Sequence, residues 1–219
     1  MKQLLLIGGI ALSMATYAQH ESDTIPHHEE APIPVEAMVG NKWAMFQTII
    51  TKDFANRKVN FFNLINYEVD YDPNVPQSYI IQSVFSYNIN RFFSVGTGAN
   101  LKAFGGFKPL ITGRFSMFNR NVGLVIQPSI ELHKDGVSEV FALFEWNPFN
   151  AGLVSPFFGI QGATNITTRN GEHDFSYINA RLGVQVAQFR LGPALNSRFV
   201  GPTGNIEMNY GGFISISIF

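Results

Sequence analysis

The chain has 219 residues, a formal net charge of −1, and a low share of charged side chains at 14% beside 46% apolar ones. It has no cysteine, which excludes disulfides, thiol catalysis and a lipid anchor on an N-terminal cysteine. A net charge near zero gives no support for nucleic-acid binding. After removal of a leader the length fits one domain.

Residues 1–18 have the pattern of a secretory signal peptide. Lys2 supplies a positive start, residues 4–12 form a short apolar core, and residues 16–18 offer small side chains before a cut at Gln19. The apolar core is shorter than the roughly 20 residues that a membrane-spanning helix needs. We therefore predict a cleaved leader, with a retained interfacial anchor as the alternative.

Residues 19–41 read as a flexible, acidic lead-in that is also rich in histidine and proline. Five acidic residues and no lysine or arginine lie between His20 and Glu36. This segment has too little apolar surface to offset the entropy of ordering it. A metal-binding tract on His20, His27 and His28 is the sharper alternative, but their spacing defines no coordination geometry. We predict no metal site and no cofactor.

From residue 43 onward, apolar and polar side chains alternate with the period of two that β-strands have. In residues 122–133, Leu124 and Ile126 fall on an apolar face, and Gln127 falls on the opposite, polar face. Residues 178–186 and 189–199 repeat the pattern, joined by the two-residue link 187–188. Across this link, Val186 and Phe189 fall on the same apolar face, as a tight hairpin requires.

This alternation predicts an all-β chain with ten strands in residues 42–219. They are expected near 59–71, 78–88, 92–103, 110–118, 122–133, 139–146, 156–167, 175–186, 189–199 and 208–219. Residues 43–51 are also strand-like, which would make eleven, whereas single-chain bacterial barrels have even numbers. Twelve strands are therefore the alternative, with a partner strand within residues 31–41.

The links between these strands predict a difference between the two ends of the molecule. Four links, at 88–91, 119–121, 147–155 and 187–188, are comparatively short or tight. The others carry Gly, Pro, Asn and Asp in turn and loop combinations, at 72–74, 105–106, 135–136, 170–171 and 201–202. Short turns at one end and longer loops at the other are typical of outer-membrane barrels.

The distribution of charge favours a membrane barrel over a soluble one. Polar strand faces are rich in Gly, Ser, Thr, Asn and Gln, which suit a crowded lumen better than a free surface. Strands of about 9–12 residues match a tilted crossing of the hydrocarbon core. In lipid the sheet must also close, because an unpaired backbone amide costs several kcal/mol there. We predict a closed antiparallel up-and-down transmembrane β-barrel with apolar side chains outside.

The last strand resembles the end of outer-membrane β-barrel proteins. Members of this superfamily typically end in an aromatic residue after an alternating strand, and this chain ends in residues 210–219 with Phe219. The resemblance implies recognition of Phe219 by the barrel-assembly machinery and a place in a bacterial outer membrane, in contact with its lipid. One departure is that Phe219 shares parity with Ser217 and Ser215, and not with the isoleucines.

Eight charged side chains fall on the predicted lumen face. These residues could line a narrow pore and set its selectivity, or they could form a structural network of opposite charges. We favour the network, because a barrel of ten to twelve strands encloses little space. If a pore exists, the late arginines at 181, 190 and 198 would favour anionic solutes. The eight are Glu68, Lys102, Arg114, Glu131, Glu145, Arg181, Arg190 and Arg198.

The sequence predicts no enzyme. Only His133 and His173 lie in the barrel segment, and Ser129, Glu131 and His133 spread over ~13 Å of one strand, too far for a triad. His173 is expected in a solvated loop. The predicted function is a narrow passive channel for small solutes or a structural or accessory envelope component of unknown partners. A soluble lipid-binding barrel and, less favoured, a membrane-embedded lipid hydrolase are the alternatives.

Overall fold

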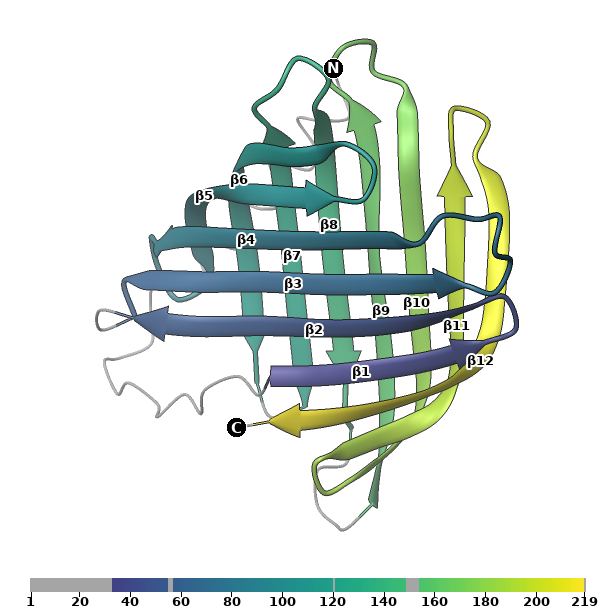
Figure 1. Ribbon diagram of the computed structural model, residues 1–219. Coiled ribbons are helices and arrows are strands. Elements are labelled where there is room, and N and C mark those ends of the chain that lie inside the picture. The colour runs from purple at the N-terminus through teal and green to yellow at the C-terminus, as the bar shows by residue number, and fades with distance from the viewer. Residues whose placement is uncertain (1–32, 55–56, 120, 149–153, 219) are drawn as a thin grey trace, which may run out of the picture. The chain divides into compact units, whose positions relative to one another are not determined.

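The computed structural model describes residues 33–54, 57–119, 121–148 and 154–218, and these form twelve strands (Figure 1). No helix within these ranges is long and apolar enough to cross a membrane. The strands are β1 (Ile33–Gly40), β2 (Trp43–Phe54), β3 (Val59–Asp70), β4 (Ser78–Asn88), β5 (Phe93–Lys102), β6 (Gly106–Phe118), β7 (Val122–Glu131), β8 (Val137–Trp146), β9 (Val154–Thr167), β10 (His173–Val186), β11 (Phe189–Val200) and β12 (Asn205–Ile218).

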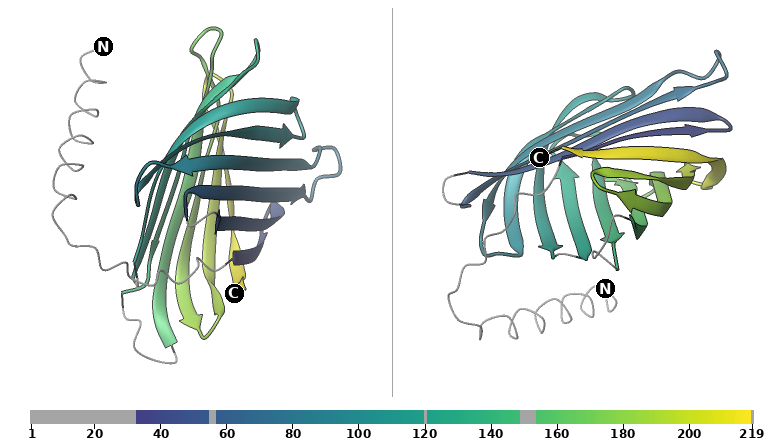
Figure 2. Two further views of the ribbon diagram at one scale, coloured as in Figure 1. Left: turned by 90° about the vertical axis from the view of Figure 1, so that its left-hand side faces the viewer. Right: turned by 90° about the horizontal axis from the view of Figure 1, so that it is seen from below.

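The strands form a closed antiparallel barrel in which each pairs with its neighbours in sequence. Closure comes from β1, which pairs with β2 on one side and with β12 on the other. Figures 1 and 2 show β2 to β5 on one wall, running steeply across β7 to β10 on the opposite wall. Such a crossing is expected because the strands of a closed barrel tilt relative to its axis.

Two predictions about the strands are corrected. The barrel has twelve strands and not ten, and it begins at Ile33 and not at residue 42. The alternative of a partner strand within residues 31–41 is confirmed, because Ala37 pairs with Phe46 of β2 and with Ile214 of β12. The acidic, proline-containing composition of residues 19–36 hid this strand. Pro34 is tolerated because the β1–β2 ladder begins one residue later, at Val35.

The predicted asymmetry of the links is wrong. At the end that carries Ile33 and Ile218, here the terminal end, the links are 55–58, 89–92, 119–121, 147–153 and 187–188. At the opposite end, here the loop end, they are 41–42, 71–77, 103–105, 132–136, 168–172 and 201–204, and on average these are hardly longer. Local side chains hold the loop end. The backbone N–H of Asn74 donates to Asp72, which lowers the pKa of the Asp72 carboxyl.

The predicted orientation of the two strand faces is confirmed. Leu182 and Ile126 on the outside are 61% and 40% exposed, whereas Gln127 and Arg181 inside are only 1% and 5% exposed. A soluble sandwich or barrel has the reverse distribution, with its apolar face inside and its polar face in water. The outer surface of this barrel is therefore apolar on nearly every strand.

Pro128 on β7 and Pro193 on β11 both lie at interruptions of a ladder, Pro193 in the gap of the β10–β11 pairing between Leu191 and Ala194. The β6–β7 pairing skips from Thr112 and Ser129 to Phe115 and Ile126, so Pro128 lies in the gap. Thr112 Oγ1 donates to the carbonyl oxygen of Pro128 there at 2.7 Å. Because proline has no N–H for the ladder, these gaps are the places where a strand tolerates it.

Candidate functional site

The candidate site is the barrel interior, where side chains from opposite walls are hydrogen-bonded to each other. Gln47 on β2 and Gln161 on β9 exchange two amide hydrogen bonds, of 2.8 and 2.9 Å. These strands are not neighbours in the barrel, so this pair, here the amide bridge, crosses the lumen. Both side chains are buried. Tyr177 accepts a further bond from Gln161, at 3.1 Å.

A second polar chain runs along the inner face of β4, β5 and β7. Gln127 donates to Gln82 at 2.7 Å, and Gln82 donates to Asn100 at 3.0 Å. Asn100 in turn donates to Glu131 at 3.0 Å. The two glutamines and the asparagine are at most 1% exposed. Fully buried amides need such partners, because an unpaired one costs about 1–3 kcal/mol.

An apolar cluster fills the space beside these amides. Phe62 on β3 faces Phe141 on β8, with ring centroids 6.3 Å apart, and Val84 and Leu110 are completely buried next to them. The full cluster is Ile49, Phe62, Leu64, Val84, Leu110, Val125, Phe141 and Ala163. Side chains of the wall itself therefore occupy the middle of the barrel.

The structure brings six of the eight predicted charged residues together in pairs. Glu68 binds Arg198, and Glu145 binds Arg190 at 3.1 Å. Lys102 binds Glu131 at 2.6 Å, and Lys108 adds a second contact to the same carboxylate at 3.4 Å. Pairing of this kind is what the structural-network interpretation expects.

The other two predicted residues have partners outside the predicted set. Arg181 binds Glu36 of β1, with its Nε at 2.9 Å and its Nη2 at 2.8 Å from Glu36 Oε1. Arg114 donates to the neutral side chains of Asn60 and Ser86. The sequence hides Glu36, because its acidic, proline-containing segment resembles a flexible lead-in, although Glu36 shares parity with Pro34 and Met38 in an alternating stretch.

Each lumen arginine also lies over an aromatic ring. Arg198 is 3.8 Å from the centroid of Trp43, and Arg190 is 4.4 Å from that of Phe157. Arg114 and Arg181 lie over Phe62 and Phe213 at 5.2 and 5.7 Å. For Arg181, Arg190 and Arg198, cation–π contact and a carboxylate partner together compensate the desolvation of the guanidinium group, whereas Arg114 has a ring and two neutral side chains. The late arginines are thus individually neutralised and do not form a field of free positive charge.

The remaining sequence candidates do not meet in the lumen. Glu131 is held by lysines, whereas His133 lies beyond the end of β7, where its ring accepts from the Asp135 N–H at 3.2 Å. His173 is the first residue of β10 and partly buried, not a solvated loop residue. Phe219 and the histidines of residues 19–28 lie outside the described residues. Within the described part, no group of His, Cys, Asp or Glu could hold a metal ion.

No family model and no curated protein sequence matches the chain. Solved structures do match its fold. The NanC porin aligns over 85% of this chain and 100% of its own, with 10% identity and a TM-score of 0.54. The KdgM porin aligns over 85% and 99%, with 12% identity and a TM-score of 0.49. LpxR from Salmonella typhimurium aligns over 86% and 100%, with 9% identity and a TM-score of 0.43. At such identities the likeness to NanC concerns the fold alone: the chain has the fold of a small outer-membrane porin barrel.

Proposed function

We propose that the chain is an integral barrel of a bacterial outer membrane whose resting lumen is closed by its own side chains, and that it serves as a structural or accessory component of the envelope. The observation that carries the closed lumen is the amide bridge between Gln47 and Gln161, set beside the apolar cluster. The apolar exterior and the closed sheet support the membrane location, because lipid tolerates neither a polar surface nor an open sheet edge.

A narrow passive channel for small solutes is the second candidate. It is favoured by the polar character of the contacts that block the lumen, because water can replace amide and ion-pair contacts as side chains rearrange. Glu145, at 31% exposure of its side chain, already reaches solvent near the terminal end. We expect the assembly machinery of the outer membrane to insert the barrel in either case.

A soluble lipid carrier has less support. Such a protein would turn its apolar face toward an internal ligand, whereas here residues such as Leu182 and Ile126 face outward. It would also leave the membrane on carbonate extraction, and we expect this chain to stay in the membrane fraction.

Electrical recording separates the two leading candidates. We expect the purified wild-type barrel to carry no steady current in a planar bilayer. Replacing both members of the amide bridge, Gln47→Ala with Gln161→Ala, should raise the current, because it removes the hydrogen bonds that join β2 to β9. The matched control is Thr48→Ala, which changes the outer face of the same strand and should stay silent. A steady current through the wild-type barrel would contradict the closed lumen and favour the channel.

A further inference from the structure

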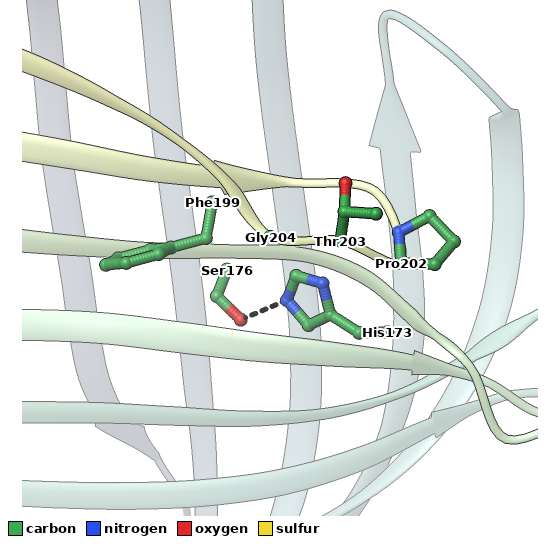
Figure 3. Close-up of a pocket in the computed structure, with 6 residues that line it drawn as sticks. All are labelled: His173, Ser176, Phe199, Pro202, Thr203 and Gly204. Carbon is green, nitrogen blue, oxygen red and sulfur yellow. Dashed lines mark hydrogen bonds between the residues drawn. The ribbon is translucent and has the colours of Figure 1, made fainter.

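A pocket at the loop end holds a serine and a histidine that the lumen does not use. It lies between β10, β11 and the link 201–204, with a volume of about 380 Å³ (Figure 3). His173 and Ser176 come from β10, and the ring of Phe199 comes from β11. The full lining is His173, Ser176, Phe199, Pro202, Thr203 and Gly204.

The hydrogen bonds of His173 define its tautomer. Its Nδ1 lies 2.7 Å from the carbonyl oxygen of Gly201, and its Nε2 lies 2.8 Å from Ser176 Oγ. A carbonyl oxygen only accepts, so Nδ1 carries the ring proton and donates it to Gly201. In the neutral ring Nε2 is then unprotonated and can accept from the Ser176 hydroxyl when that hydroxyl turns from Thr164 Oγ1, to which it donates at 2.9 Å. A nucleophile, a base and a group that orients the base are thus in contact.

Local backbone features place these three groups. The pairing of β9 with β10 shifts register between His173 and Phe175, and a bulge of this kind re-aims a side chain. Gly201 has a φ of 72°, which glycine adopts without strain. Its carbonyl oxygen also accepts from the Gly204 N–H at 3.0 Å, which closes the turn and holds the carbonyl toward the ring.

The serine faces the outside of the barrel and not the lumen. Ser176 pairs with Thr164 and Phe199 on the neighbouring strands, and its hydroxyl donates to Thr164 Oγ1 at 2.9 Å. On the same outer face, Ile166 and Ile178 are exposed. In a membrane-embedded barrel, the pair therefore lies on the lipid-facing wall toward the loop end, where the apolar surface gives way to the links.

We propose that Ser176 and His173 form a hydrolytic site for the long-chain acyl ester of a membrane lipid. The lipid part of this proposal rests on the proposed membrane location, because only there does an acyl chain lie along Ile166 and Ile178. Ser176 Oγ bonds to the ester carbonyl carbon while its proton passes to His173 Nε2. The bond between that carbon and the alcohol oxygen breaks, and the alcohol leaves with the proton from His173. Water then attacks the carbonyl carbon of the acyl-serine while its proton passes to His173 Nε2. The bond between that carbon and Ser176 Oγ breaks, Oγ takes the proton back from His173, and the fatty acid is released.

Covalent labelling tests the nucleophile without any assumption about lipid. Purified full-length protein in detergent micelles is treated with a fluorophosphonate probe and examined by mass spectrometry. We expect one adduct on Ser176 in the wild-type chain, none in Ser176→Ala, and labelling slowed about 100-fold in His173→Gln, in line with the contribution of a general base. Ser138→Ala, which removes an outward serine on β8 at the same end, should label like the wild type.

Turnover tests the substrate class. The same proteins are mixed with phosphatidylethanolamine vesicles in one arm and lipopolysaccharide in another, and released fatty acid is measured. Release in either arm that is lost in Ser176→Ala and kept in Ser138→Ala supports the proposal and identifies the source of the ester. Absence of an adduct on wild-type Ser176, or release unchanged in Ser176→Ala, would overturn it. A heat-dependent gel shift and carbonate extraction of the same samples report membrane insertion separately, so failure of the site and failure of the membrane assignment are distinguishable.

Discussion

Replacing Glu36 by alanine is expected to lower the free energy of unfolding by about 3–5 kcal/mol, the cost of breaking a buried ion pair from one side. The substitution leaves the Arg181 guanidinium inside the barrel with 6% of its side chain exposed and its carboxylate partner gone. Phe213 and Asn196 contact the same guanidinium but carry no charge. The effect is measurable by urea unfolding of the barrel refolded into lipid vesicles.

Glu207→Ala is the matched control for that substitution. Glu207 also pairs with a lumen arginine, Arg198, but at 3.8 Å and with about half of its side chain exposed. Exposed pairs contribute about 0–1 kcal/mol, so this variant should unfold close to the wild type. Equal losses for Glu36→Ala and Glu207→Ala would contradict the assignment of β1 and its glutamate to the barrel wall.

Ile126→Arg is expected to destabilise the membrane-inserted barrel by about 2–4 kcal/mol, the cost of an arginine on the lipid face near the middle of the bilayer. Ile126 lies midway along β7, points outward, and is 40% exposed. If water covered this face, an exposed arginine would cost little. The measurement is again urea unfolding in vesicles, supported by the yield of the heat-modifiable form.

The control for the lipid face is Val75→Arg. Val75 is an apolar residue of nearly the same exposure, 42%, but it lies in the link 71–77 at the loop end. Arginine should be tolerated there because the link lies outside the strands. Similar small effects for Ile126→Arg and Val75→Arg would argue that the outer face of β7 is in water.

Alternation predicted most of the fold because it reports directly on which face of a strand each side chain takes. The residues of β4, at 78–88, were predicted with the bounds that the structure has. Alternation failed to predict β1, because Pro34, Glu36 and the preceding acidic stretch resemble a solvated linker. Composition averages over a whole segment. Whether a segment joins the sheet depends instead on the pairing of individual residues, such as Ala37 with Phe46.

The site was only partly predictable from the sequence. Parity placed Arg198 and Glu68 on the lumen face, but their pairing depends on how β11 and β3 face each other after closure. Neighbouring strands are recognisable in a sequence, and opposite strands are not. The contact of His173 with Ser176 was hidden for a second reason, because it depends on a register shift and on the turn at Gly201. Both features are set by backbone geometry and leave no periodic signal.

The central claim is that the apolar face of each strand meets lipid while the polar face encloses the lumen, and single-cysteine labelling of β10 tests it most directly. The chain has no cysteine of its own, so each variant carries one fluorophore. With a quencher confined to the lipid tails, we expect strong quenching at Leu182→Cys and Val184→Cys and little at Asn179→Cys and Gln185→Cys. Quenching at the last two positions with none at the first two would contradict the account.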